Sequence, residues 1–114
     1  MVKQMADQIR IVYCPVEGEP SVMMIDNTLE AMQKLVGGYI ETITFGDYVV
    51  ICNEEGRLKG LPENPCMPDY VGDILFARVK GDEFASLPAS EAQIIRIVST
   101  KFYGKSNDQA AVSG

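Results

Sequence analysis

The stretch that decides the fold spans residues 26–65 and reads DNTLEAMQKLVGGYIETITFGDYVVICNEEGRLKGLPENP. It joins a helix pattern, a double glycine, a tight hairpin and a long loop rich in glycine, proline and acidic residues. Capping and turn residues mark where the helix and the hairpin begin and end. This stretch therefore predicts a helix, then a β-hairpin, then an irregular loop.

Helical spacing begins directly after Asn27. Asn27 is a good N-cap residue, and Glu30 three positions later completes a capping box, in which each side chain accepts a hydrogen bond from the other residue's backbone N–H. One apolar stripe runs along the helix and contains Leu29, Met32, Leu35 and Val36. Gly37 supplies a left-handed C-terminal cap, and Gly38 frees the chain to turn into a strand. We expect a helix over residues 28–36.

A two-residue hairpin follows the double glycine. The β-branched and aromatic runs at 39–45 and 48–53 are separated only by Gly46 and Asp47, so a positive φ is expected at the glycine. This turn imposes three cross-strand pairs on one face: Phe45 with Tyr48, Ile43 with Val50, and Glu41 with Cys52. Because both faces of the hairpin carry apolar residues, we expect it to lie at the centre of the sheet.

Glu41 is unusual because its carboxylate shares a face with Ile43, Val50 and Cys52. An ionised carboxylate buried on an apolar face needs a partner or a raised pKa. Two interpretations stay open. Glu41 either sits at a strand end beside solvent or a basic side chain, or it contributes to a ligand site.

Residues 53–67 follow neither the helical nor the strand period. We expect a long ordered loop or a short strand with turns, and such a segment either packs on the core or binds something. The candidate binding residues are Glu41, Asn53, Glu54, Glu55, Arg57, Lys59 and Asn64. The residues expected to have structural roles are Asn27, Glu30, Gly37, Gly38, Gly46, Gly56, Gly60 and Pro62.

Strand patterns flank this central stretch. Residues 10–16 and 21–25 read as strands whose simplest arrangement is a hairpin, and 69–79 reads as a further strand, with a short partner at 83–87. From Pro88 the spacing becomes helical over about 89–101, although the run IIRIV within it fits a strand equally well.

The predicted fold is α+β. It has a mixed, mainly antiparallel sheet of about four to six strands with a ββαββ core, packed against the helix at 28–36, and a C-terminal helix around 89–101. Residues 1–103 form one globular domain, and 104–114 form a flexible tail.

Composition indicates a cytoplasmic, non-membrane protein. Hydrophobic residues make up 46% of the 114 residues, yet no apolar run reaches the length of a membrane helix, and the N-terminus lacks a secretory pattern. The three cysteines, Cys14, Cys52 and Cys66, are odd in number and widely spaced, which favours reduced thiols. The net charge of -6 disfavours direct nucleic-acid binding, and an acidic nucleic-acid mimic of the antirestriction type stays an alternative.

The sequence contains no histidine, which removes Ser-His-Asp and Cys-His catalysis and the commonest zinc ligand. The separated cysteines do not form a metal or redox motif, and no phosphate-binding glycine motif occurs. We therefore expect no cofactor, no metal and no catalytic residue. The alternative is a small hydrolase or transferase that uses Glu41 together with Glu54 or Glu55, with or without Mg²⁺.

The runs LEAMQKLVGGYIE, YVVICNEEGRLKGLPEN and VGDILF resemble an uncharacterised domain-of-unknown-function family of bacteria, bacteriophages and mobile elements. The resemblance covers about residues 10–90. The positions that carry it are Gly37, Gly38, Tyr39, Ile40, Glu41, Asn53, Glu54, Glu55, Gly56, Gly60, Leu61, Pro62 and Asn64. It implies a small cytoplasmic protein that acts on a host factor. We expect a non-catalytic binding domain whose partner is a protein or a small molecule, and a homodimer formed through a strand edge or the C-terminal helix stays open.

Overall fold

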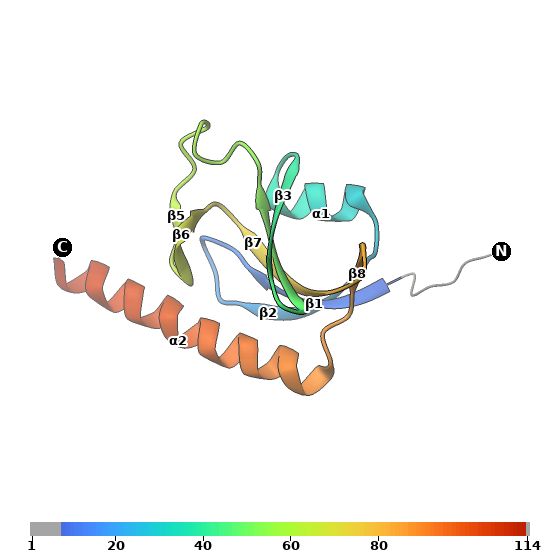
Figure 1. Ribbon diagram of the computed structural model, residues 1–114. Helices are drawn as coiled ribbons and strands as arrows, with labels where there is room; N and C mark the ends of the chain where they lie inside the picture. The colour runs from blue at the N-terminus through green and yellow to red at the C-terminus, as the bar shows by residue number, and fades with distance from the viewer. Residues whose placement is uncertain (1–7, 114) are drawn as a thin grey trace.

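The computed structural model describes the backbone of residues 8–113 and the side chains of residues 8–103 (Figure 1). Within this part of the chain the elements are β1 (Gln8–Cys14), β2 (Ser21–Asp26), α1 (Leu29–Val36), β3 (Ile40–Phe45), β4 (Tyr48–Asn53), β5 (Glu63–Asn64), β6 (Met67–Val71), β7 (Ile74–Lys80), β8 (Glu83–Ala85) and α2 (Ala89–Ser113). The predicted α+β fold is confirmed, including the C-terminal helix. No described helix is both long and apolar enough to cross a bilayer.

The main sheet is antiparallel and has the strand order β2-β1-β7-β4-β3, with β8 paired to β7. The register of the β3–β4 hairpin is the predicted one, with Glu41 opposite Cys52 and Phe45 opposite Tyr48. The expectation that this hairpin lies at the centre of the sheet was wrong for β3. Because β7 occupies the other side of β4, β3 becomes an edge strand, and its side chains are mostly exposed.

The two helices cover opposite faces of the curved sheet (Figure 1). Side chains alternate between the faces along each strand. Val49 and Ile51 of β4 therefore join one core cluster with Met32 of α1, while Val50 of β4 joins a second cluster with Ala92 of α2. A strand that is apolar on both faces thus supplies both cores.

The N-cap of α1 is Thr28, so the predicted capping box of Asn27 and Glu30 was wrong. The Thr28 hydroxyl accepts a hydrogen bond of 3.1 Å from the backbone N–H of Ala31. The Asn27 amide instead donates to the Phe84 carbonyl of β8 at 3.2 Å, a tertiary contact that helix spacing does not reveal. Glu30 lies exposed in the first turn, where its charge suits the helix dipole.

The predicted glycine turns are present. Gly37 ends α1 with φ of 79° and donates to the Gln33 carbonyl, and Gly46 turns the hairpin with φ of 61°. A Cβ at Gly56 would lie 2.7 Å from a methyl carbon of Val71, so this glycine lets the loop pack closely on β6.

One expectation on the chain after β4 was confirmed and one was wrong. Residues 53–67 contain the short strand β5, one of the two forms expected of this segment, whereas the single strand expected at 69–79 is divided into β6 and β7. The division falls at Gly72, whose φ of 78° bends the chain between the two strands. The predicted tail at 104–114 lies outside the residues whose side chains are described, and it stays a prediction.

Asn64 connects three parts of this region. Its side chain is fully buried, and its Nδ2 donates to the carbonyls of Cys14 and Gly72, each at 2.9 Å. Its Oδ1 accepts from the backbone N–H of Cys66 at 2.9 Å. One amide group therefore ties the end of β1, the bend before β7 and the turn of the β5–β6 ribbon together.

Replacing this amide should cost a large part of the protein's stability. Asn64→Ala leaves two buried carbonyls and one buried N–H without their partner, and each such loss costs about 1–3 kcal/mol. We expect urea denaturation to show a fall of roughly 3 kcal/mol or more. The neighbouring exposed residue provides the control, since Glu63→Ala should change the free energy of unfolding by less than about 0.5 kcal/mol. Equal effects of the two changes would contradict the role assigned to Asn64.

Candidate functional site

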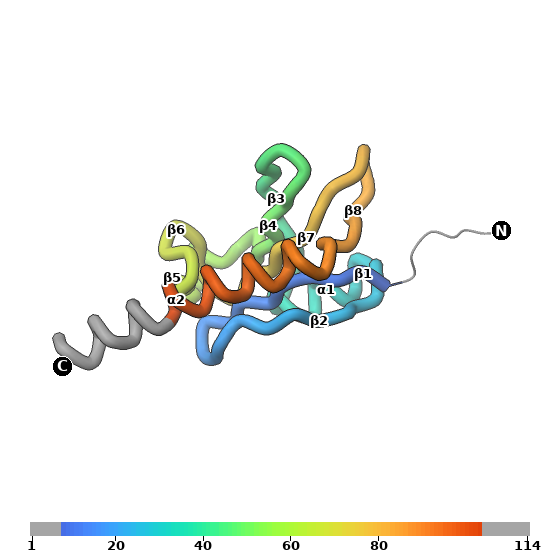
Figure 2. The backbone as a smooth tube through the Cα atoms, turned by 90° about the horizontal axis from the view of Figure 1, so that it is seen from below, coloured from blue at the N-terminus to red at the C-terminus, as the bar shows by residue number. Residues whose placement is uncertain are grey.

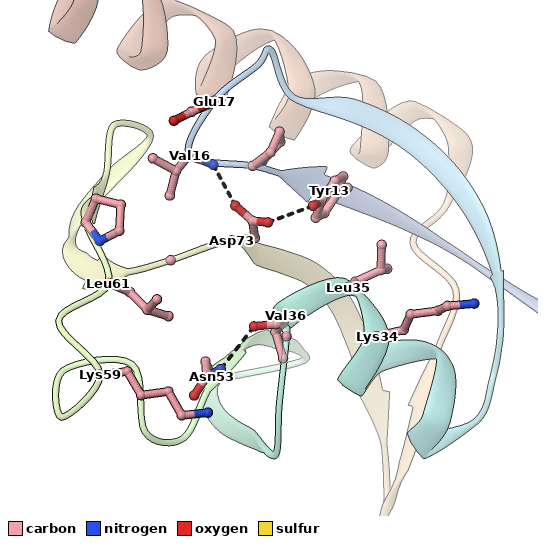
Figure 3. Close-up of a pocket in the computed structure, with 14 residues that line it drawn as sticks. Tyr13, Val16, Glu17, Lys34, Leu35, Val36, Asn53, Lys59, Leu61 and Asp73 are labelled. Atoms are coloured by element: carbon pink, nitrogen blue, oxygen red, sulfur yellow. Dashed lines mark hydrogen bonds between the residues drawn. The ribbon is translucent and has the colours of Figure 1, made fainter.

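The 53–62 loop separates two hollows on the surface. A cleft of about 580 Å³ lies between this loop, the C-terminal end of α1 and the end of β1 (Figure 3). On the other side of the loop, a hollow of about 120 Å³ lies beside Glu41 of β3. We refer to them as the large cleft and the small hollow.

Asn53 fixes the beginning of the loop against α1. Its buried side chain donates from Nδ2 to the Val36 carbonyl at 3.1 Å and accepts from the Glu55 N–H at 2.7 Å. A Cβ at Gly38 would lie only 2.9 Å from the Asn53 nitrogen, so this contact requires glycine at position 38. The wall of the large cleft is therefore attached to the end of the helix.

The large cleft combines an apolar surface with a few polar groups. Its apolar part includes Leu35 and Val36 of α1, Leu61 of the loop, and the nearby Pro15 and Pro62. Its ionisable side chains are Tyr13, Glu17, Lys34, Lys59 and Asp73. Such a lining suits an amphiphilic small molecule.

Asp73 and Tyr13 form a fixed pair in this cleft (Figure 3). The Tyr13 hydroxyl donates to Asp73 Oδ2 at 2.9 Å, and the Val16 N–H donates to Asp73 Oδ1 at 2.8 Å. Burial, followed by the hydrogen bond and the negative charge of Asp73, raises the pKa of Tyr13 to about 12. The phenol therefore keeps its proton at neutral pH and leaves an oxygen lone pair to accept a hydrogen bond from a ligand.

Lys59 is the better placed of the two cations in the cleft. In Figure 3 it extends from the loop toward Asn53, whereas Lys34 points away from the loop. The Lys59 ammonium lies 3.6 Å from the Glu55 carboxylate, and both side chains are about half exposed. An exposed pair of this kind is weak, so it leaves the ammonium available to an anionic ligand.

The small hollow holds two of the acidic candidates, Glu41 and Glu54. Glu41, Glu54, Arg57 and Asp69 line it, so the structure brings Glu41 next to the loop. Arg57 donates to the Asp69 carbonyl at 2.5 Å, and Glu41 lies exposed on the edge strand. The hollow is far smaller than the roughly 300 Å³ that ligand pockets usually reach. It can hold water or a single side chain.

The predicted site residues thus divide between the large cleft, the small hollow and neither of the two. Asn53 and Lys59 line the large cleft. Glu41, Glu54 and Arg57 line the small hollow, and Asn53 also lines it. Glu55 lines neither and faces Lys59 instead. Asn64 is fully buried and has no exposed surface to offer a ligand.

Sequence reasoning missed Tyr13, Lys34 and Asp73 as members of the cleft. Tyr13 and Asp73 are 60 residues apart, and the pairing of β1 with β7 brings them together. The available signal was their position near chain-bending residues, because Tyr13 lies two positions before Pro15 and Asp73 directly follows Gly72.

The three cysteines, although distant in sequence, lie in the same core cluster under α2, and all are buried and free. Hydrogen bonding with the Cys66 thiol, followed by burial, raises the pKa of Cys14. Burial and the charge of Glu41 raise the pKa of Cys52. Among the described residues, no group of three histidine, cysteine or acidic side chains is arranged to hold a metal ion.

The Tyr13–Asp73 pair gives a pH-dependent prediction. An unperturbed tyrosine titrates near pH 10, so the folded state holds the Tyr13 proton more tightly than the unfolded state does. The stability that Tyr13 contributes is complete below pH 10 and is lost as the pH rises to about 12. In a spectrophotometric titration of the five tyrosines, Tyr13→Phe should remove a component with a midpoint near pH 12. Asp73→Asn should move the midpoint of that component toward pH 10. If the component that Tyr13→Phe removes has its midpoint near pH 10, the pairing is contradicted.

Comparison with known proteins gives one match. No curated protein and no solved structure matches the chain. A family model described as "Domain of unknown function (DUF3846)" matches residues 9–100. The match extends past the expected limit near residue 90 and includes the beginning of α2. Since it covers most of the chain, the protein belongs to this family of domains of unknown function.

Proposed function

We propose that this protein is a non-catalytic binding domain that holds a small molecule in the large cleft. The observation that carries the proposal is the cleft itself. Its volume of about 580 Å³ lies within the range of roughly 300–1,000 Å³ typical of ligand sites, and an apolar surface meets a few polar groups there.

The position of Lys59 favours one class of ligand. The ammonium of Lys59 and the protonated hydroxyl of Tyr13 are polar contacts beside the apolar surface of Leu35 and Leu61. A molecule with an anionic group and an apolar or aromatic part would pair with the ammonium and cover that surface. A phosphorylated or carboxylated metabolite with a ring fits this description.

The ionisable groups of the cleft support binding rather than turnover. Both carboxylate oxygens of Asp73 already accept hydrogen bonds, from Tyr13 and from the Val16 N–H, and the raised pKa of Tyr13 makes it a poor general base. The carboxylate-dependent enzyme is the weaker candidate because Glu41 and Glu54 are exposed around the small hollow and not in the large cleft. An acidic mimic of nucleic acid also receives less support, because such a mimic needs negative charges that form a continuous surface.

This function would suit a cytoplasmic protein of a bacteriophage or mobile element. Such a protein could sequester a host metabolite or a nucleotide-type signal, and it would need affinity but no chemistry. The role of the 53–62 loop would then be to form one wall of the cleft, with Lys59 as its charged contact.

The proposal is tested by equilibrating the purified protein with the small-molecule fraction of a bacterial lysate and identifying the retained compounds by mass spectrometry. We expect an anionic, partly apolar compound to be enriched. Lys59→Met should weaken its binding about tenfold, as expected when a charged contact worth about 1.4 kcal/mol is lost. Lys80→Met removes the same charge from the exposed end of β7 and should bind like the wild type.

Two results would contradict the proposal. One is the retention of no compound by the folded wild-type protein. The other is equal affinity of the Lys59→Met and Lys80→Met variants for the retained compound. Thermal melting followed by circular dichroism verifies that both variants are folded, which is expected because both lysines are exposed.

A further inference from the structure

The helix α2 covers only part of the sheet face on which it lies. It packs on β1 and β2, as Figure 2 shows from below. Beside it, on the same face, a groove of about 490 Å³ runs between Phe45, Tyr48 and Phe76 of the sheet and Ile94 and Ile95 of the helix. We call this the apolar groove.

The helix itself presents a second apolar stripe. Ala92, Ile95 and Ser99 face the sheet, and Ala92 and Ser99 are buried. A different stripe, at a spacing of four residues, consists of Ile94, Val98 and Phe102, which are 61%, 47% and 52% exposed. Because Ile94 also lines the apolar groove, this stripe and the groove form one continuous surface.

The size of this surface approaches what a stable dimer needs. Phe45, Ile94, Val98 and Phe102 are each about half exposed. If such large side chains present roughly 200 Å² each when free, the four expose roughly 400 Å² per molecule. Two copies would bury roughly 800 Å² of apolar area, so a polar rim of roughly 400 Å² brings the total to the lower end of the range of about 1,200–2,000 Å² found for specific interfaces.

The charges also favour a second copy at this face. The chain has a net charge of -6, so two copies repel each other over most of their surfaces. From 89 to 103 the helix carries Arg96 and Lys101 against a single acidic residue, Glu91. Glu91 lines the groove and is paired, with Arg78 at 3.1 Å and with the Tyr48 hydroxyl at 2.5 Å. The apolar surface is therefore free of excess negative charge.

We propose that the protein forms a twofold-symmetric homodimer in which α2 of each copy lies in the apolar groove of the other. Ile94, Val98 and Phe102 of one copy would contact Phe45 and Phe76 of its partner. The same patch is used on both copies, as twofold symmetry requires. Val98 lies in the middle of the stripe and would face Val98 of the partner subunit. This inference does not depend on the ligand proposed for the large cleft, which lies on the side of the sheet occupied by α1.

Sedimentation velocity over roughly a hundredfold range of concentration tests the dimer, because its population depends on concentration. We expect the wild type to sediment as a dimer at the upper end of the range. Val98→Glu places a charge in the part of the interface formed by the helix, and Phe45→Glu places one in the part formed by the sheet. Each should raise the dissociation constant at least about a hundredfold, as expected for an unpaired buried charge.

The matched control is Leu29→Glu. Leu29 is 52% exposed, so the change removes a comparable apolar surface and adds the same charge, but on α1. The Leu29→Glu variant should remain dimeric. Because all three substituted residues are about half exposed, the variants are expected to fold, and circular dichroism verifies this.

The other outcomes overturn the proposal. A wild type that is monomeric throughout the range excludes the dimer. A dimer that persists in both Val98→Glu and Phe45→Glu places the interface elsewhere, and its loss in Thr42→Pro would assign it to the open edge of β3. If the wild type becomes dimeric only with a compound retained in the cleft, the symmetric contact through α2 is not sufficient and the proposal fails.

Discussion

The buried amide of Asn64 is the interaction on which the rest of the structure depends. The β5–β6 ribbon is too short to satisfy the backbone groups around it, and buried backbone groups without partners are costly. Asn64 supplies the missing partners to Cys14, Cys66 and Gly72 at once. This holds the chain bent at Gly72, so that the next residue, Asp73, reaches Tyr13 and the backbone of Val16.

A second buried asparagine completes the large cleft from the other end of the loop. Asn53 attaches the first loop residues to the C-terminus of α1, and the Pro62 carbonyl accepts from Gly72 near the last ones. The 53–62 loop is therefore fixed at both ends, and its middle carries Lys59 to the cleft. A wall that is already fixed would reduce the entropy lost if the cleft binds a small molecule as proposed.

The sequence was sufficient wherever a local rule determines the structure. The turn at Gly46 determines the β3–β4 register, and the left-handed Gly37 determines the end of α1. The sequence was insufficient where segments far apart in the chain compete for the same hydrogen-bonding side chain or the same strand edge. Asn27 satisfies the criteria for an N-cap but is held by Phe84, and β3 has a central-strand pattern but lies at the edge because β7 pairs with β4. The Tyr13–Asp73 pair depends on strand pairing across 60 residues, which no local spacing encodes.

The large cleft is the ligand site that we propose for this domain. Amide chemical-shift mapping of the wild-type protein with a library of anionic aromatic fragments distinguishes it from the other hollows of the surface. We expect the perturbed amides to cluster around Leu35, Lys59 and Leu61. Perturbations confined to the apolar groove beside Ile94, or to the small hollow beside Glu41, would contradict it.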